Sequence, residues 1–370
     1  MKVTHIILVI LGIISVILLT SCEKKPDSSI SEDGKISMRL LTDATGVDDK
    51  SFNAAAWRGV LQYYGDTWDN QANRGKAYDV ITAESEDMYI PNLMLATDAG
   101  YDLIAVTGFT WENALMQVAK ENPSQKYMIV DITGGFSPNV MQAAYSEHEG
   151  SYLAGAAAAL KAKEDNIANP RFGFIGGMKG AVITKFEIGY VQGLLSVLPD
   201  AYVEDYYVDS WGDAAKAKTR AKSWYDSGIY AIFSAAGSSG NGTIAQAKEY
   251  REAGMNVWAI GVDSDQYEDG LYNDTDSAVL TTMLKLVENS MTYALKSVED
   301  GSFKGEKIIF DLAGGGVGYS AANKDLSENI ISELEEIKEK IISGEIIVAA
   351  TYADAKLLPG FPQHLNAADD

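Results

Sequence analysis

Ile229-Tyr-Ala-Ile-Phe-Ser-Ala-Ala-Gly-Ser-Ser-Gly-Asn-Gly242 places a short apolar run directly before a glycine-rich turn. A helical pattern follows from Asn241 to Ala253, and a second apolar run, Asn256 to Val262, leads into Asp263. Short apolar runs bounded by turn residues are typical of buried strands, and a helix between two of them is typical of a parallel crossover. The segment therefore predicts a strand at 229–233, a helix and a second strand at 256–262, with polar residues near the carboxyl ends of both strands.

The same alternation extends over most of the chain. Further strands are predicted at 37–42, 77–81, 103–106, 127–131, 140–144, 172–175 and 201–208. Further helices are predicted at 51–63, 111–121, 151–163, 183–198, 214–226 and 326–343. This rhythm predicts parallel sheets with helices on both faces, and such folds bind ligands at the carboxyl ends of their strands. Because polar strand ends recur in both halves of the chain, we expect two sheets that face a common cleft.

The N-terminus has the pattern of a secreted lipoprotein. Lys2 precedes a 13-residue apolar run from Ile6 to Leu18, and Leu19-Thr-Ser-Cys22 follows directly. A positive start, an apolar core and small residues before a cysteine are typical of a signal peptide at 1–21. A transmembrane anchor is the alternative, but a spanning helix needs about 20 apolar residues. We therefore expect lipidation of Cys22, the only cysteine in the chain, and a flexible polar tether at 22–36.

Size and charge narrow the possible functions. Without the leader, whose one charged side chain is Lys2, 349 residues remain, with 29 basic and 52 acidic side chains and a formal charge of −23. This length favours two lobes, and the charge opposes binding to nucleic acid or to anionic lipid. With His148 and His364 as the only mature histidines, a histidine metal site or a Ser-His-Asp triad is not expected. We predict no cofactor.

Polar residues at the ends of predicted strands are the candidate ligand contacts. In the loop before the first helix, Asp43 and Asn53 offer an acceptor and an amide, and Phe52 offers a flat face. The alternative is that Ser51 caps the helix while Phe52 fills the core. Asp131 and Asp263 end apolar runs and suit either acid–base catalysis or hydrogen bonding to a ligand. We favour binding, because no nucleophile or metal ligand accompanies them.

A cation and a glycine turn complete the candidates. Lys285 is the only cation in the stretch Thr-Thr-Met-Leu-Lys-Leu-Val. It is either a surface lysine or a donor inside a cleft lined by acids. The turn from Gly237 to Gly242 superficially resembles a phosphate cradle, but no Lys-Ser/Thr pair follows it. We therefore interpret Gly237 as a position where a ligand can approach the backbone closely.

Several ordered stretches resemble one known family. They are Thr42-Asp-Ala-Thr-Gly-Val-Asp-Asp-Lys-Ser-Phe-Asn53, Gly108-Phe-Thr-Trp-Glu-Asn-Ala114, Tyr127-Met-Ile-Val-Asp131, Glu147-His-Glu-Gly-Ser-Tyr-Leu-Ala-Gly155, Gly173-Phe-Ile-Gly-Gly-Met178, Ala235-Ala-Gly-Ser-Ser-Gly-Asn-Gly242, Ile260-Gly-Val-Asp-Ser-Asp-Gln266 and Thr282-Met-Leu-Lys285. Together they resemble the basic membrane protein family of lipoproteins, whose purine-nucleoside receptors are substrate-binding components of ABC importers. The resemblance covers nearly all of residues 37–320.

The resemblance implies a role for each candidate. The two aromatic rings that sandwich the base in the family's nucleoside receptors fall on Phe52 and Phe233. The other implied contacts are Asp43 and Asp131 to the base, Asp263 and Lys285 to the ribose, and Asn53 and Gly237 at the rest of the pocket. A carboxylate-lined pocket of this kind should repel phosphates, which favours adenosine, guanosine or inosine over nucleotides.

The resemblance also implies a fold, partners and a location. We expect a two-lobed type I periplasmic-binding fold in which each lobe is a parallel sheet flanked by helices, with the ligand in the cleft. The expected division is 37–143 with about 284–309 for lobe 1, about 144–283 with about 310–355 for lobe 2, and a C-terminal tail at 356–370. The implied partners are an ABC permease and its ATPase, at a membrane that Cys22 reaches through its lipid. A sugar or signalling-ligand receptor of the same fold, a nucleoside-cleaving enzyme that uses Asp131 or Asp263 as base, and a structural surface lipoprotein remain alternatives.

Overall fold

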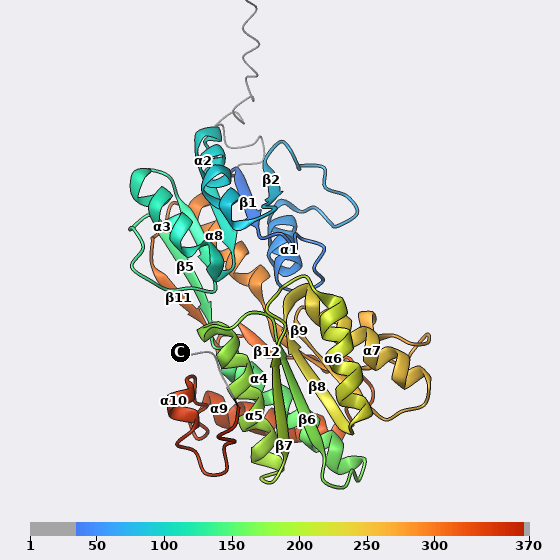
Figure 1. Ribbon diagram of the computed structural model, residues 1–370. Coiled ribbons are helices and arrows are strands. Elements are labelled where there is room, and N and C mark those ends of the chain that lie inside the picture. The colour runs from blue at the N-terminus through green and yellow to red at the C-terminus, as the bar shows by residue number, and fades with distance from the viewer. Residues whose placement is uncertain (1–34, 366–370) are drawn as a thin grey trace, which may run out of the picture.

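The computed structural model describes residues 35–365, which form two lobes, one above the other in Figure 1. Each lobe contains a six-stranded sheet. In the first lobe the strand order is β11-β5-β4-β3-β1-β2, and every pairing is parallel. Its strands are β1 (Met38–Thr42), β2 (Tyr78–Thr82), β3 (Leu103–Thr107), β4 (Tyr127–Val130), β5 (Val140–Tyr145) and β11 (Lys307–Phe310). Cys22, the signal peptide at 1–21 and most of the 22–36 tether lie outside the described residues.

The second sheet has the order β12-β10-β9-β8-β6-β7. Its strands are β6 (Arg171–Gly176), β7 (Tyr202–Tyr207), β8 (Ile229–Ala235), β9 (Trp258–Asp263), β10 (Val279–Lys285) and β12 (Val317–Tyr319). All pairings are parallel except that of β10 with β12, which is antiparallel. The predicted α/β fold with two parallel sheets is therefore confirmed.

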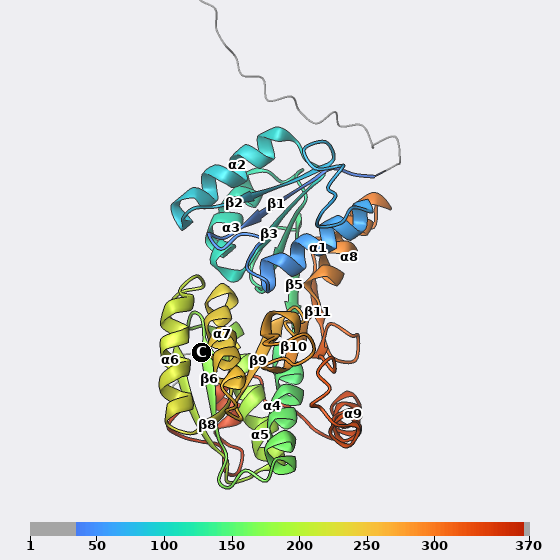
Figure 2. The same ribbon diagram turned by 90° about the vertical axis from the view of Figure 1, so that its right-hand side faces the viewer.

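Helices cover both faces of each sheet, as Figure 2 shows. The helices of the first lobe are α1 (Phe52–Tyr64), α2 (Tyr89–Ala99), α3 (Glu112–Glu121) and α8 (Val287–Glu299). Those of the second are α4 (Glu147–Glu164), α5 (Ala181–Val197), α6 (Ala214–Asp226), α7 (Gly240–Glu252), α9 (Glu328–Ile342) and α10 (Tyr352–Ala355). Short 3₁₀ turns are η1 (Glu86–Met88), η2 (Phe109–Trp111), η3 (Gly237–Ser239) and η4 (Glu268–Gly270).

Buried apolar side chains on both faces of each sheet explain why the helices pack there. Helices α2 and α3 bury apolar side chains on one face of the first sheet, and α6 and α7 do the same on the second. The other faces belong to one larger apolar cluster, to which α1, α4, α5 and α8 contribute. Helices α4 and α5 pack closely because glycines stand at their contact, and a Cβ on Gly193 would lie 2.0 Å from the Tyr152 carbonyl oxygen. The cluster spans both lobes and holds them together beside the cleft.

The chain passes between the sheets after β5, after β10 and after β11, and these three crossovers contact one another. The Ser146 backbone N–H donates to the Phe310 carbonyl at 3.0 Å, and the Leu286 N–H donates to the Gly316 carbonyl at 2.9 Å. The rings of Tyr145 and Phe310 stack with centroids 5.2 Å apart. The three crossovers therefore form one contiguous junction between the lobes.

No helix within residues 35–365 combines the length and apolar character needed to cross a membrane.

Candidate ligand-binding cleft

A cavity lies between the lobes at the carboxyl ends of their strands. Seven of the eight residues predicted from the sequence line it: Asp43, Phe52, Asn53, Asp131, Gly237, Asp263 and Lys285. The eighth, Phe233, does not. Parallel sheets bring the carboxyl ends of their strands to one edge, which is why residues more than 200 positions apart meet here.

The start of α1 is held by a residue that the sequence analysis did not select. The buried carboxylate of Asp49 accepts hydrogen bonds from the backbone N–H groups of Ser51, Asn53 and Ala54 at 3.0, 2.8 and 3.0 Å. Burial raises its pKa to about 6, although these three bonds act in the opposite direction. Asp49 therefore satisfies the free N–H groups of the first helical turn, which is the task of an N-cap.

Ser51 occupies the N-cap position, yet its side chain makes no capping bond. Its hydroxyl instead donates to Asp263 Oδ2 in the other lobe at 2.5 Å. Two further bonds join the lobes here, from Arg58 to Ser264 Oγ at 2.7 Å and from Ser264 Oγ to the Ser51 carbonyl at 2.8 Å. The alternative interpretation of Ser51 as a side-chain cap was thus wrong, because Asp49 caps the helix and leaves Ser51 free to contact the second lobe.

Asp43 and Asn53 form a fixed polar edge in the first lobe. Asn53 Nδ2 donates to Asp43 Oδ1 and to Thr45 Oγ1, both at 3.0 Å. Thr107 Oγ1 donates to Asn53 Oδ1 at 2.5 Å, which fixes the orientation of the amide. The Thr45 backbone N–H also reaches Asp43 Oδ1, at 3.0 Å. Because these contacts use one oxygen of Asp43, the other can accept a hydrogen bond from a ligand.

The floor of the cavity carries a buried ion cluster. Lys285 has 1% of its side chain exposed, and its Nζ lies 2.5 Å from Asp131 Oδ1 and 3.1 Å from Glu147 Oε1. The same ammonium lies 5.1 Å from the Phe52 ring centroid and 5.4 Å from that of Phe186. Of the two interpretations of Lys285, the surface one is wrong, because the end of β10 places the side chain inside the cleft.

The acids of the cluster differ in their proton affinity. Burial raises the pKa of Asp263 to about 7, an effect that nearby Lys285 and the Ser51 hydroxyl reduce. Burial also raises the pKa of Asp131, against the field of Lys285. Burial would raise the pKa of Glu147 as well, but two lysine ammonium groups, Lys285 and Lys185, hold it below its ordinary value. The cleft thus holds a carboxylate–ammonium pair beside an acid, Asp263, that can gain or lose a proton near neutral pH.

Asp131 and Asp263 also share an uncommon backbone conformation. Their φ angles are +81° and +64°, in the left-handed region that side chains other than glycine seldom occupy. Asp131 directly follows β4 and Asp263 ends β9, so each carboxylate turns out of its sheet at the edge that faces the other lobe. Residues held in sparsely populated backbone regions often mark binding sites.

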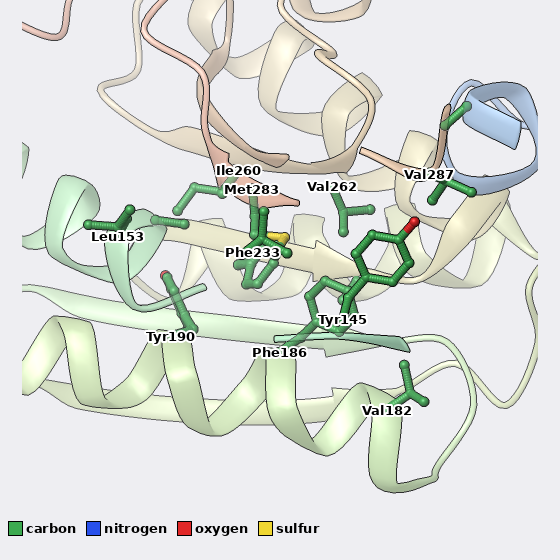
Figure 3. Close-up of a cluster of buried hydrophobic side chains, with 14 of the residues drawn as sticks. Tyr145, Leu153, Val182, Phe186, Tyr190, Phe233, Ile260, Val262, Met283 and Val287 are labelled. Atoms are coloured by element: carbon green, nitrogen blue, oxygen red, sulfur yellow. The ribbon is translucent and has the colours of Figure 1, made fainter. Parts of the chain in front are cut away.

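The predicted stacking role of Phe233 does not fit its position. Its side chain is fully buried and packs against Phe174, Phe186 and Tyr190 with centroids 5.6, 6.3 and 5.3 Å away. Figure 3 shows Phe233 in this apolar cluster. The strand was predicted to end at Phe233, but β8 continues to Ala235, which lines the cavity on the same face of the strand.

Other aromatic rings occupy the cavity wall instead. Phe52 and Phe109 come from the first lobe, and Phe186 and Trp211 come from the second. Phe109 and Trp211 meet edge to face across the lobes with centroids 6.1 Å apart. The Trp211 ring lies so close to Gly177 that a Cβ there would approach it to 2.2 Å. The sequence offered no pattern that marks Trp211, which lies in the loop after β7.

Within the described residues, no group of three or more histidine, cysteine, aspartate or glutamate side chains is arranged to hold a metal ion. The groups that the cavity does present are carboxylates, one ammonium and flat rings, which together suit a ligand with hydroxyl or N–H donors and an aromatic or apolar face.

Comparisons with known proteins identify the family of the chain. Residues 36–352 match the family model described as "ABC transporter substrate-binding protein PnrA-like". The chain is 36% identical over 348 residues to the ABC transporter nucleoside-binding protein BmpA of Lactococcus lactis, covering 91% of this chain and 96% of that protein. It is 30% identical over 345 residues to basic membrane protein A of Borreliella burgdorferi, covering 92% and 95%.

A solved ABC transporter solute-binding protein from Aeropyrum pernix superposes with a TM-score of 0.75 at 25% identity, covering 87% of this chain and 96% of that one. The fold, the cleft and the relatives thus lead to the same conclusion. The chain belongs to the Bmp family of PnrA-like ABC transporter substrate-binding proteins.

Proposed function

We propose that this protein is a lipid-anchored receptor that binds purine nucleosides in the cleft and delivers them to an ABC importer. The observation that carries the proposal is the position of Asp131, Lys285 and Asp263 beside aromatic rings from both lobes. The name of the Lactococcus relative, a nucleoside-binding protein, supports the same ligand class. The chain then acts by binding and release, with the importer's permease and ATPase as its partners.

The base lies against the aromatic wall in this proposal. A purine offers a broad π face, and each well-placed ring contributes about 0.5–1.5 kcal/mol beyond the area it buries. Phe52 from the first lobe and Trp211 from the second are the proposed stacking rings, so that ligand contact also joins the lobes. The free oxygen of Asp43 accepts from a ring N–H or an exocyclic amino group of the base.

The ribose lies over the ion cluster. Its two neighbouring hydroxyls match an ammonium donor, Lys285, and an acid, Asp263, that accepts when ionised and can donate when protonated. Asp43, Asp49, Asp131 and Asp263 all line the cavity, so a phosphate would meet several acids. Nucleosides are therefore the proposed ligands and nucleotides are excluded by charge repulsion.

The ligand assignment is tested by mass spectrometry of small molecules released from the purified protein, followed by calorimetry with adenosine, guanosine, inosine, cytidine and ribose. A nucleoside that copurifies or binds at micromolar or tighter affinity supports the proposal and identifies the base. Tighter binding of ribose than of any nucleoside would make the protein a sugar receptor. Recovery of cleaved base in place of intact nucleoside would make it an enzyme.

The anchor is tested separately, because it rests on the leader and Cys22 alone. Cys22→Ala removes the proposed lipid attachment and should move the protein from the membrane fraction to the soluble fraction, while leaving nucleoside affinity unchanged. The physical reason is that the acidic chain has no attraction of its own for anionic lipid. Equal membrane association of Cys22→Ala and the unmodified sequence would contradict the lipid anchor. Substrate-binding proteins of ABC importers work outside the cytoplasmic membrane, where a lipid keeps them near the permease.

A further inference from the structure

Glu147 is a buried acid that touches the cleft's cation without lining the cleft. It begins α4, immediately after the chain has crossed from β5 into the second lobe, and 1% of its side chain is exposed. Its Oε1 lies 3.1 Å from Lys285 Nζ, and its Oε2 lies 3.0 Å from Lys185 Nζ. The residue thus stands directly behind the ammonium that faces the cavity.

Lys185 connects this acid to the junction between the lobes. Its Nζ also donates to the carbonyl of Tyr145, the last residue of β5, at 3.1 Å. The ring of Tyr145 lies 5.0 Å from Lys285 Nζ and stacks on Phe310, which ends β11. Lys285 itself ends β10, so its ammonium lies beside groups of two crossovers, and the third packs against Tyr145 through Phe310.

Charge balance accounts for a third acid on the far side of the Lys285 ammonium. Lys285 faces Asp131 and Asp263 on the cavity side, and both of these acids are attracted to the same cation. An ammonium attracted from the cavity side alone would move toward those acids and use its N–H donors on them. Glu147 attracts the cation from behind, and Lys185 compensates the charge of Glu147.

We propose that Glu147 is a positioning residue that holds the Lys285 ammonium where it can donate to the ligand's ribose hydroxyls, and that ties this position to the junction of the crossovers through Lys185. This inference rests on the proposed nucleoside function and deepens it. It assigns ribose selectivity to a residue that does not contact the ligand. The readout must therefore be sensitive to hydroxyl recognition rather than to overall stability.

The test compares Glu147→Gln with the unmodified protein by calorimetry, using adenosine, guanosine and inosine, each beside its 2′,3′-dideoxy counterpart. Glu147→Gln should weaken binding of the ribonucleoside by at least about tenfold, the loss expected for one charge-assisted hydrogen bond. Binding of the dideoxynucleoside should change by less than about threefold, because it lacks the hydroxyls that Lys285 contacts. The unmodified protein's preference for the ribonucleoside should shrink accordingly.

Two further variants distinguish a positioning role of Glu147 from a general effect of the substitution on folding. Glu149→Gln removes a neighbouring carboxylate of α4, which accepts from the Leu312 backbone N–H at 2.8 Å and has no contact with Lys285 among the described residues. It should keep the ribose preference. The double variant Glu147→Gln/Lys185→Met removes both charges together, so it avoids an unpaired, half-buried lysine and should fold while still losing the preference.

The results distinguish this inference from the proposed function. If the unmodified protein prefers ribonucleosides and Glu147→Gln or the double variant keeps that preference, the positioning role is overturned and the receptor stands. Equal losses for both ligand types, or the same loss in Glu149→Gln, also overturn it. If the unmodified protein binds no nucleoside, the proposed function fails and the inference fails with it.

Discussion

Replacing Phe233 with alanine tests whether this side chain contributes to the stability of the second lobe or to ligand affinity. The side chain is fully buried and has three aromatic neighbours, so its removal leaves a cavity that rigid rings cannot easily fill. A buried Phe→Ala change costs about 3–5 kcal/mol. With an unfolding entropy of roughly 2 cal/mol/K per residue over the described chain, a loss of about 4 kcal/mol lowers the melting temperature by roughly 6 °C.

Affinity for the nucleosides that we propose as ligands should respond differently. Phe233 does not line the cavity, and its only aromatic neighbour that does is Phe186. We therefore expect Phe233→Ala to change the dissociation constant by less than about threefold at a temperature where the variant is folded. Trp211→Ala, in the same lobe, should show the reverse: a loss of affinity of about tenfold, as one stacked ring contributes, with little change in melting temperature.

The assays are calorimetric titration and thermal unfolding of the same preparations, with circular dichroism to confirm that each variant is folded. One result would refute the reasoning. Suppose that Phe233→Ala abolished nucleoside binding but melted at the same temperature as the unmodified protein. Phe233 would then have to contact the ligand, and its assignment to the core would be wrong.

Two further predictions concern buried acids. Between its ordinary pKa of 3.8 and its folded value of about 7, Asp263 keeps its proton in the folded state and loses it in the unfolded state, so stability falls as pH rises through this window. Asp263→Asn should flatten that decline in a series of melting temperatures from pH 4 to 8; parallel curves for the two proteins would show that Asp263 does not cause it. Asp49→Ala should lower the free energy of unfolding by about 1–2 kcal/mol through loss of the α1 cap, measured by urea titration. Asp49→Asn, which keeps an acceptor oxygen, should lose less, and equal losses would show that capping is not the role of Asp49.

The alternation of short apolar runs with helical patterns was sufficient to predict the two sheets and most of their strands. It also placed Asp43, Asp131 and Asp263 correctly at strand ends, because a polar residue after a buried run must face the edge of a parallel sheet. Strand β10 was not predicted, since its sequence from Val279 to Lys285 ends in a cation and carries no turn residue before the next helix. The residues around Lys285 left open whether it lies at the surface or in the cleft, and the family resemblance placed it in the pocket, where the structure also has it.

The remaining errors arose because a local sequence pattern does not determine where a strand ends or which distant residues come into contact. The strand through Phe233 could end there or two residues later, and only the packing of Tyr190 and Phe174 against the ring decides between the two. Glu147 and Lys185 lie 38 positions apart, so nothing in the sequence indicates that they form an ion pair. Trp211 reaches the cleft because Gly177, far away in sequence, leaves room for its ring.

The left-handed backbone at Asp131 and Asp263 has a consequence for any effort to engineer this receptor. A side chain in that conformation costs about 1 kcal/mol that glycine does not. At position 263 the folded chain also buries an acid, so both the backbone conformation and the burial of this residue oppose folding. A screen that selects variants by heat resistance alone should therefore favour glycine at this position, and the variant that it selects would lack the carboxylate that we propose contacts the ligand.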